Sequence, residues 1–551
     1  MTRSFVFLAD TGISASSLAQ RMRNEKVQTP IVSIAKKRID MICCRNRASD
    51  VQRHHFSFSL SNIEDWRNKM NMQQAEQSKL CGQHAVVIGA SMAGLLAGRV
   101  LSDHFERVTI IERDCFPTGV EARKGVPQGR HAHGLLTKGA SILMEFFPEL
   151  FPALLAGGSS DADMVADLRW HHFGVWKAQF PSNMTGYIQS RPFLEEHVRS
   201  CLAARENVRF IDGCEVAQLC ANSDRTSITG VQLRHRNGAQ SEETLSADLV
   251  IDASGRGSQA PQWLTSLGYA RVKEESVKVD VGYASRVYRR PSQLPSNWKA
   301  LLIYPKAPEG KRAGLILPME GDAWMVTLAG WLRDYPSDDE TGFLDYARSL
   351  PMPDLYEAIK DAEPVTPIVT HKFPANQRRY YERMARFPEG FIIVGDALCS
   401  FNPVYGQGMT VAALEASALQ ACLQQQQSRG TRRNVASFAH RFQKAVAKVA
   451  NVPWQLATGE DFRYPQTVGK RPPGTSLLHR YMGRVHELVA SDHRATLRFY
   501  EVMNMLKPPL ALFEPHILFA VLFKGRRQRP GHDAAVGQVE EERREMEGAP
   551  R

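Results

Sequence analysis

The chain has 551 residues, of which 43% are hydrophobic, so it can bury more than one core and is globular rather than disordered. Its formal net charge of +11 suits a nucleic acid, an anionic cofactor, an acidic partner or an anionic membrane surface. Nucleic acid is disfavoured because the sequence lacks zinc-finger spacing, an aromatic ribonucleoprotein motif and a basic helix followed by heptads. A membrane-spanning helix is disfavoured because no run of about 18 apolar residues occurs.

Cysteine usage and the two ends of the chain bear on its location. Nine cysteines are scattered without a CxxC pair, and with no recognisable secretory signal this favours reduced thiols and a cytoplasmic protein. Residues 1–80 are rich in Ser, Arg and Lys and lack sustained apolar periodicity. We interpret them as an extension that is disordered or not native, with Met70 and Met72 as alternative starts, rather than as a transit peptide. The segment 534–551 is predicted to be a disordered tail.

The folded body opens with a strand–helix–strand pattern. His84–Ile88 is a short apolar strand, Ser91–Leu101 has helical periodicity, and Val108–Ile111 is a second strand. Such a unit predicts a parallel sheet of the Rossmann type, in which a dinucleotide binds at the turn between the first strand and the helix.

The turn after the first strand carries a glycine motif, Gly-Ala-Ser-Met-Ala-Gly. Gly89 can form the tight turn and Gly94 the close contact between helix and strand, while Ser91 stands where the dinucleotide fingerprint has its second glycine. The serine hydroxyl can itself reach a phosphate. Glu112 ends the second strand, where a carboxylate accepts hydrogen bonds from ribose hydroxyls, and Arg113 can cover the adenine or a phosphate. The alternative is a turn without a ligand, which leaves Glu112 as a surface acid.

Further strands follow along the chain. They are predicted at 248–251, 277–283, 301–304, 315–318, 324–329 and 391–394, and a Glu-Gly-Asp turn at 320–322 joins two of them as a hairpin. Beyond Gln427 the chain becomes helical. Candidate walls of a substrate pocket, with ordinary sheet core as the alternative, are Tyr283, Tyr304, Trp324 and Val326. The last two share one face of their strand because side chains alternate along a strand.

A second motif, Gly-Asp followed by Asn-Pro-Val-Tyr-Gly-Gln-Gly-Met, comes after the strand at 391–394 and opens a helix. It resembles the second FAD signature of flavoprotein hydroxylases of the aromatic-hydroxylase and squalene-epoxidase type. The resemblance implies that Asp396 binds the ribityl chain of FAD. It also implies a turn that faces the pyrimidine edge of the flavin, formed by Pro403, Gly406, Gly408 and Met409. The positive end of the following helix would stabilise an anionic reduced flavin there.

Two other segments extend this resemblance. Ala-Ser-Gly-Arg-Gly-Ser at 253–258 is similar to the central Asp-Gly motif of the same hydroxylases, which is associated with FAD and NADPH, but Ser254 occupies the Asp position. That departure leaves open whether NAD(P)H reduces the flavin directly or through a separate flavin reductase. The segments 125–136 and 453–461, with the glycine motif, resemble bacterial polyene epoxidases of polyether antibiotic assembly. This resemblance spans roughly residues 84–525.

The segment 125–136 also adds charged candidates. Arg130, and Arg191 in a Ser-Arg-Pro-Phe-Leu segment, are candidate contacts to a phosphate or to the flavin, with surface ion pairs as the alternative. His131 and His133 form a His-x-His pair, but no third ligand pattern lies nearby. We therefore predict structural or flavin-edge histidines and no metal site.

The resemblance implies an α/β fold. In this fold a Rossmann-type FAD-binding domain carries an inserted antiparallel-sheet substrate domain and a helical C-terminal region. The expected boundaries are 81–270 and 376–425 for the two parts of the FAD-binding domain, 271–375 for the substrate sheet, and 426–533 for the helical region.

The resemblance also implies an FAD-dependent monooxygenase. Reduced FAD would react with O₂ to give a C4a-hydroperoxide that transfers one oxygen atom to a lipophilic substrate. The favoured reaction is epoxidation of an alkene in a polyene, terpenoid or polyketide, whereas hydroxylation of a phenol would benefit from a base that the sequence does not assign. The alternatives are an FAD-dependent alkene reductase of the geranylgeranyl-reductase type and a non-enzymatic flavin-binding protein. A flavin halogenase is disfavoured because no Trp-x-Trp-x-Ile-Pro segment occurs.

An apolar stretch lies near the C-terminus, at Leu510–Phe523. It is interrupted by polar residues and a proline at 514–516 and is followed by basic residues at 524, 526 and 527. We interpret it as a buried terminal helix, with peripheral contact to a membrane surface as the alternative.

Overall fold

The computed structural model describes residues 80–235, 242–292, 297–428 and 438–523. These ranges belong to one compact unit that begins at Glu76. The extension predicted for residues 1–80, apart from Leu80, and the tail predicted for 534–551 lie outside the described residues.

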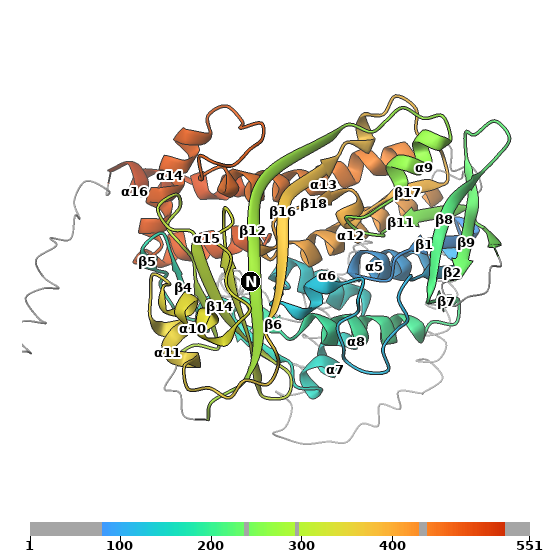
Figure 1. Ribbon diagram of the computed structural model, residues 1–551. Helices are drawn as coiled ribbons and strands as arrows, with labels where there is room; N and C mark the ends of the chain where they lie inside the picture. The colour runs from blue at the N-terminus through green and yellow to red at the C-terminus, as the bar shows by residue number, and fades with distance from the viewer. Residues whose placement is uncertain (1–79, 236–241, 293–296, 429–437, 524–551) are drawn as a thin grey trace, which may run out of the picture. The chain divides into compact units, whose positions relative to one another are not determined.

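A five-stranded parallel sheet forms the first part of the fold (Figure 1). Its strands, in spatial order, are β17 (Phe391–Ile393), β11 (Leu249–Asp252), β1 (Gly82–Ile88), β2 (Phe105–Ile111) and β7 (Val208–Ile211). All neighbouring pairs are parallel. The central strands are apolar and largely buried, because helices pack against this sheet and strands β8 (Cys214–Ala221) and β9 (Ile228–His235) of a smaller antiparallel sheet also share its core. The predicted Rossmann-type unit is confirmed.

Four helices accompany this sheet: α5 (Met92–Leu101), α8 (Arg191–Ala203), α12 (Gly408–Ser428) and α13 (Phe438–Asp461). Helix α5 contacts β1 and β2, α8 contacts β7, and α13 contacts β17. Helix α12 packs between α5 and α13, so the helix that follows the second motif lies beside the helix that follows the first. This packing brings two motifs that are some 300 residues apart in the sequence to one end of the sheet.

An eight-stranded sheet forms the second part of the fold. Its spatial order is β18 (Cys399–Ser400), β16 (Val369–Arg379), β12 (Glu274–Arg289), β15 (Ala323–Gly330), β14 (Arg312–Met319), β13 (Ala300–Ile303), β4 (Leu168–His172) and β5 (Val175–Trp176). Every neighbouring pair is antiparallel except β13 and β4. The predicted hairpin is present, since β14 pairs with β15 and Met319 faces Ala323 across the turn.

The sheet draws on more of the chain than the strands predicted between 271 and 375. Strands β4 and β5 come from residues 168–176, which lie within the range 81–270 expected for the FAD-binding domain. Strand β16 crosses the expected boundary between 375 and 376. The long strand β12 carries Val277 into the core of the parallel sheet and Tyr283 into the core of the second sheet, so the two parts share a continuous backbone (Figure 1).

The two faces of the eight-stranded sheet pack against different helices. On β15, Trp324, Val326 and Leu328 point into a cluster with α10 (Glu340–Arg348) and α11 (Asp354–Ile359). Trp324 and Val326 therefore share a face, as predicted, but the prediction that they line the substrate pocket is wrong. The alternation of side chains along a strand shows which residues point together, and the choice of face depends on helices that are distant in the sequence.

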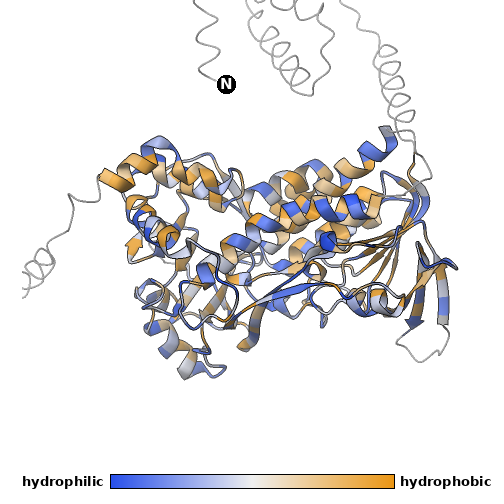
Figure 2. Cartoon of the chain, turned by 90° about the horizontal axis from the view of Figure 1, so that it is seen from above, coloured by the Kyte–Doolittle hydropathy of each residue, from blue (hydrophilic) through white to orange (hydrophobic). Residues whose placement is uncertain are grey.

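Three helices of the C-terminal region lie against the other face, which completes the predicted architecture: α14 (Thr475–Leu488), α15 (His493–Met503) and α16 (Pro515–Phe523). Helix α16 is largely apolar, and in Figure 2 it forms the orange segment at one end of the molecule. Its residues are partly buried and partly exposed. Among the described helices, none is by itself long and apolar enough to cross a membrane, and one bent pair passes by length and composition.

Smaller elements connect these parts. A three-stranded antiparallel sheet contains β8 (Cys214–Ala221), β9 (Ile228–His235) and β10 (Glu242–Ser246), and a two-stranded one contains β3 (Ser160–Asp163) and β6 (Thr185–Ile188). The bent helix pair is α6 (Thr137–Phe146) and α7 (Leu150–Ala156), and α9 (Ala260–Ser266) is a further helix. The short 3₁₀ helices are η1 (Pro127–Arg130), η2 (Tyr381–Arg383), η3 (Gly395–Ala397), η4 (Pro403–Tyr405) and η5 (Pro509–Phe513).

Candidate active site

One cavity of about 970 Å³ connects the parallel sheet with the eight-stranded sheet. At one end it is lined by the turn between β1 and α5 and by Glu112 after β2. Its middle is lined by η3, η4 and the start of α12, and its far end by β4, β14, α14 and α15. This volume lies near the upper end of the roughly 300–1,000 Å³ typical of small-molecule sites.

The glycine turn has the geometry that a dinucleotide requires. Gly89 has φ +100°, and a Cβ there would lie 2.6 Å from the carbonyl oxygen of Ala253. A Cβ on Gly94 would lie 1.8 Å from the carbonyl oxygen of Gly89, so only glycine permits this contact between helix and strand. Ser91 caps α5, and its hydroxyl accepts a hydrogen bond from Arg191 Nη2 at 2.7 Å. That hydroxyl is therefore already engaged by the protein.

Glu112 lines the same end of the cavity, and its carboxylate is held in place by the backbone. Its Oε2 accepts from the amide of Ala90 at 2.9 Å, and its Oε1 accepts from the amide of Asp114 at 3.1 Å. Arg123 Nη1 forms an ion pair with the same group at 2.7 Å. A carboxylate fixed in this way is oriented before any ligand arrives, which is what a ribose-binding group requires.

Behind the glycine turn, two arginines and two glutamates form a buried network that the sequence did not reveal. Arg123 binds Glu112 and Glu195, and Arg191 donates to Glu195 from Nε at 3.2 Å and from Nη2 at 3.0 Å. Burial opposes the ionisation of Glu195, but Arg191 and Arg123 outweigh it and hold its pKa below the usual value. Arg130, by contrast, is exposed and does not line the cavity, so the structure does not bring it together with the other predicted cofactor residues.

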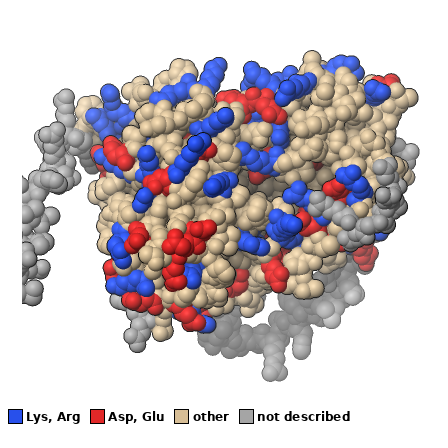
Figure 3. Space-filling model, in the orientation of Figure 1, with Lys and Arg blue, Asp and Glu red and all other residues tan. Residues whose placement is uncertain are grey.

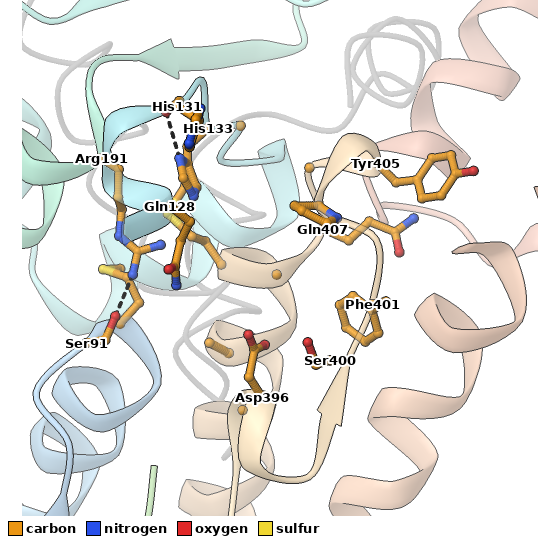
Figure 4. Close-up of a pocket in the computed structure, with 18 of the residues that line it drawn as sticks. Ser91, Gln128, His131, His133, Arg191, Asp396, Ser400, Phe401, Tyr405 and Gln407 are labelled. Atoms are coloured by element: carbon orange, nitrogen blue, oxygen red, sulfur yellow. Dashed lines mark hydrogen bonds between the residues drawn. The ribbon is translucent and has the colours of Figure 1, made fainter. Parts of the chain in front are cut away.

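The second motif lies across the cavity from this network. Figure 4 shows Ser91, Gln128 and Arg191 on one side and Asp396, Ser400 and Phe401 on the other. Gly406 adopts the left-handed conformation, with φ +64°, between η4 and the start of α12. The first turn of α12 lines the cavity, which directs the positive end of the helix into it.

Two carboxyl groups lie close together at this loop. Asp396 is exposed to the cavity, and desolvation by the surrounding protein raises its pKa although Arg256 and Arg191 oppose the shift. Glu415, on α12, accepts a hydrogen bond from the amide of Gly395 at 2.6 Å, and burial raises its pKa to about 8. Glu415 is therefore protonated at neutral pH, so it adds no second negative charge beside Asp396.

The segment that departs from the hydroxylase pattern keeps a carboxylate two residues earlier. Ser254 donates to Asp252 Oδ1 from its hydroxyl at 2.5 Å and from its amide at 2.9 Å, and Ser258 donates to Oδ2 at 2.5 Å. Asp252 is fully buried and does not line the cavity, whereas Ser254 and Arg256 do. The guanidinium carbon of Arg256 lies 4.8 Å from the centre of the Phe373 ring, and this arginine was not identified as a site residue from the sequence.

The two histidines of the His-x-His pair line the cavity between the motifs and the sheet. His131 Nδ1 lies 2.8 Å from Ser285 Oγ, and His133 Nδ1 donates to the carbonyl oxygen of His131 at 3.0 Å. Burial lowers the pKa of His131 to about 4 and that of His133 to about 3, so both rings are neutral at pH 7. The described residues contain no group of three or more His, Cys, Asp and Glu side chains placed to hold a metal ion.

The residues around the two motifs fit FAD. His131 Nε2 and Gln407 Oε1 are buried, line the cavity region and have no hydrogen-bond partner among the described residues. Glycine positions 255, 257 and 408 have open space where a side chain would stand. Unpaired polar atoms beside an open cradle indicate that a polar ligand completes this part of the site.

Comparison with known proteins agrees with this geometry. A family described as an FAD binding domain matches residues 83–451. The chain belongs to this family. Protein Rv3254 of Mycobacterium tuberculosis is 33% identical over 417 residues, which cover 73% of this chain and 85% of that protein. Kynurenine 3-monooxygenase of Salinispora tropica is 25% identical over 381 residues, which cover 63% of this chain and 74% of that enzyme.

Solved structures share the fold. The flavin-dependent brominase Bmp2 superposes with a TM-score of 0.56 at 15% identity and covers 81% of this chain and 100% of its own. PqsL, a probable FAD-dependent monooxygenase from Pseudomonas aeruginosa, superposes with a TM-score of 0.51 at 15% identity, covering 70% and 98%. The chain is thus an FAD-dependent monooxygenase of the aromatic-hydroxylase type, and FAD and NAD(P)H, the cofactors expected from the sequence, are those of this class.

Most residues predicted to contact the cofactor or the substrate meet at this cavity. Those that line it are Gly89, Ser91, Glu112, Arg113, Arg191, Asp396, Pro403, Gly406, Gly408, Met409, Tyr283 and Tyr304. Gly94 lies behind the turn, Arg130 is on the surface, and Trp324 and Val326 are on the opposite face of the sheet. The roles of individual residues toward FAD stay predictions, since placement in the cavity does not by itself assign them.

Proposed function

We propose that this monooxygenase transfers one oxygen atom from O₂ to a carbon–carbon double bond of a lipophilic substrate, such as a polyene, terpenoid or polyketide. The observation that carries the proposal is the continuity of one cavity from the FAD motifs to a wall of aromatic and aliphatic side chains. The wall consists of Trp170, Leu302, Tyr304, Leu315, Leu317, Phe499 and Tyr500. A pocket lined in this way suits an apolar substrate.

The side chains between the motifs and this wall support epoxidation over a reaction that begins with proton removal. Tyr283 donates its hydroxyl to Asn402 Oδ1 at 2.8 Å, and Tyr304 donates to the carbonyl oxygen of Val404 at 2.8 Å. Burial raises the pKa of both tyrosines, so neither is a base at neutral pH. Oxygen transfer to an alkene needs no base beside the reacting carbon, and a neutral lining excludes water around it.

When bound, FAD supplies the activation of oxygen, and the residues of this chain hold the cofactor and position the substrate. Ser91 and Arg191 lie beside the helix that would receive the pyrophosphate, and Asp396 lies beside the start of α12. The electrons come from NAD(P)H, either directly or through a separate flavin reductase. Ser254 in place of the usual Asp, already bonded to Asp252, supports the second route.

The test is a turnover measurement with isotope-labelled O₂. Purified full-length protein loaded with FAD receives NADPH, with or without a flavin reductase, and either farnesol or farnesoic acid as a polyene probe. We expect mass spectrometry to show one labelled oxygen atom in a product of at least one probe. A product that gains two hydrogen atoms and no oxygen would support an alkene reductase instead, and bound FAD that is never reduced would support a non-enzymatic flavin protein.

We also propose that the surface formed by η5 and α16 contacts an anionic membrane. Its exposed apolar side chains are Leu510, Phe513, Leu518, Phe519, Leu522 and Phe523. Exposed Arg480, Arg484 and Arg494 lie on α14 and α15, and basic side chains gather over the region of α14 at the upper left of Figure 3. Sedimentation with phosphatidylserine vesicles tests the proposal, and equal binding to neutral and anionic vesicles, or to neither, would contradict it.

A further inference from the structure

A buried lysine without an acidic partner lies directly behind the far wall of the cavity. Lys177 follows β5 and is only 3% exposed. Its Nζ contacts His486 Nδ1 at 3.1 Å, the carbonyl oxygen of His486 at 3.2 Å and the carbonyl oxygen of His172 at 3.3 Å. No carboxylate among the described residues forms an ion pair with it. A buried ammonium group without a counter-ion is costly to retain, which suggests that a ligand supplies one.

The contact with Lys177 determines which ring nitrogen of His486 carries the hydrogen. A protonated lysine can only donate, so Nδ1 of His486 accepts and the ring hydrogen lies on Nε2. His486 and His172 both line the cavity, whereas Lys177 lies behind them. The arrangement therefore offers an N–H donor to a ligand, with a positive charge directly behind that donor.

Other polar atoms in the same wall have no partner. The buried atoms Trp170 Nε1, Tyr500 Oη and His172 Nδ1 make no hydrogen bond to any described residue. Trp170 is within 6.1 Å, between ring centres, of both Tyr304 and Tyr500, so these orphaned atoms belong to one aromatic wall. Buried polar atoms are normally paired, and several unpaired ones together indicate a polar group that this wall is built to receive.

The charges around this wall favour an anion over a cation. Glu460 is a carboxylate that lines the cavity, but both of its oxygens bond to Arg463, at 2.6 Å and 3.1 Å. Burial lowers the pKa of His172 and His486 well below the usual value, so both rings are neutral. Burial also lowers the pKa of Lys177 to about 7, which leaves it as the group whose charge an incoming anion can stabilise.

We propose that this cluster, Lys177 with His172 and His486, binds a carboxylate at one end of an otherwise lipophilic substrate. The carboxylate accepts from the imidazole N–H of His486, and Lys177 acts through that ring as a positioning and charge-compensating residue. The aromatic wall holds the apolar body of the substrate between this carboxylate and the FAD motifs. The inference rests on the proposed function for the role of the cavity, and it restricts the substrate to a lipophilic acid.

The test measures binding alone and so does not depend on turnover. Full-length protein loaded with FAD is titrated by calorimetry with 2-naphthoate and with 2-naphthamide, which have the same ring system and differ in charge. We expect the acid to bind at least about tenfold more tightly than the amide at about pH 6.5. Equal affinities, or no binding of either compound, would overturn the inference and leave the oxygen-transfer proposal to its own test.

Two variants separate the charge from the packing of the wall. In Lys177→Met the preference for naphthoate is expected to disappear while the affinity for naphthamide stays within about twofold. Lys444→Met, which changes an exposed lysine on α13, is the matched control and keeps the preference. If Lys177 had a purely structural role, Lys177→Met would bind both compounds more weakly by the same factor. A preference for naphthoate that is unchanged in Lys177→Met would contradict the inference.

The pH dependence of the wild type gives a second readout that needs no variant. The titratable and charged groups around Lys177 and its two imidazole neighbours are His171, His172, His486 and Arg463, and Glu460 is bonded to Arg463. Because the lysine must be protonated to compensate the charge of a carboxylate bound by His486, naphthoate affinity should fall above about pH 7, by up to about tenfold per pH unit, while naphthamide affinity stays flat. A naphthoate affinity that does not change between about pH 6.5 and 8.5 would overturn the inference even if Lys177→Met fails to fold.

Discussion

The two ends of the cavity differ in whether their buried charges are balanced within the protein. At the dinucleotide end, Arg123 and Arg191 face Glu112 and Glu195, so the charges balance within the protein. At the far wall, Lys177 meets two imidazole rings and backbone carbonyls but no carboxylate among the described residues. A balanced network is complete without a ligand and holds loops in place, whereas an unbalanced one is complete only when a ligand arrives.

The largest expected effect comes from breaking the balanced end. Arg123→Met leaves two glutamates buried without their shared partner and should lower the free energy of unfolding by about 3–5 kcal/mol. Urea unfolding of the FAD-saturated protein measures this. Arg130→Met is the matched control, because Arg130 is exposed, and it should change the unfolding free energy by less than about 0.5 kcal/mol. Equal losses of unfolding free energy in the two variants would show that the buried network does not stabilise the fold by this amount.

The unbalanced end predicts a pH-dependent stability. Burial lowers the pKa of Lys177 to about 7, whereas the unfolded chain keeps the ordinary lysine value and therefore binds more protons above pH 7. The unfolding free energy of the ligand-free wild type should rise relative to Lys177→Met between about pH 7 and 9, by up to about 1.4 kcal/mol per pH unit. Parallel pH curves for the two proteins would mean that the lysine keeps its charge in the folded state.

A smaller effect is expected at the flavin end. Asp396→Ala removes an acceptor that faces the cavity and should weaken FAD binding by about 1–3 kcal/mol, measured by titration of the apoprotein with FAD. Glu415→Gln is the control, since burial raises the pKa of Glu415 to about 8 and the neutral amide keeps an oxygen for the amide of Gly395. Retention of full FAD affinity in Asp396→Ala would count against the assignment of the second motif.

The smallest effect tests which face of the eight-stranded sheet meets the substrate. Trp324 packs against Trp298, with ring centres 5.7 Å apart, in the cluster beneath α10 and α11. Trp324→Phe should cost about 1–2 kcal/mol of stability and leave the affinity for 2-naphthamide unchanged. If Trp324→Phe no longer binds 2-naphthamide but keeps its stability, then Trp324 lies on the face of the sheet that meets the substrate and our assignment is incorrect.

Local patterns predicted the FAD-binding end well. The β1–α5–β2 unit, the glycines at 89 and 94, and the turn at 403–409 are short segments whose spacing reflects backbone geometry. The buried network was missed because Arg123 belongs to no motif. One signal was available, since Arg191 and Glu195 are four residues apart on a helix and can pair.

The far wall could not be predicted from the sequence. It combines β4, the residue after β5, α14 and α15, which lie up to about 330 residues apart and have no shared pattern. The face of β15 was predicted wrongly for a related reason. Trp324 and Thr327 are both compatible with a pocket wall, and only the packing of α10 and α11 decides that Thr327 faces the cavity. Long-range packing of this kind leaves no periodicity in the sequence.

The central claim is that FAD and a lipophilic substrate share one cavity. It is tested most directly by the yield of labelled-oxygen product per NADPH consumed, with farnesoic acid and isotope-labelled O₂, in wild type and in Leu315→Trp. Leu315 lines the cavity on β14, which is outside the two FAD motifs in the sequence, so the larger side chain should occupy substrate space. The account predicts that Leu315→Trp keeps its bound FAD and loses most of the oxygenated product. Unchanged product yield in this variant, or a wild-type protein that cannot be reconstituted with FAD, would contradict it.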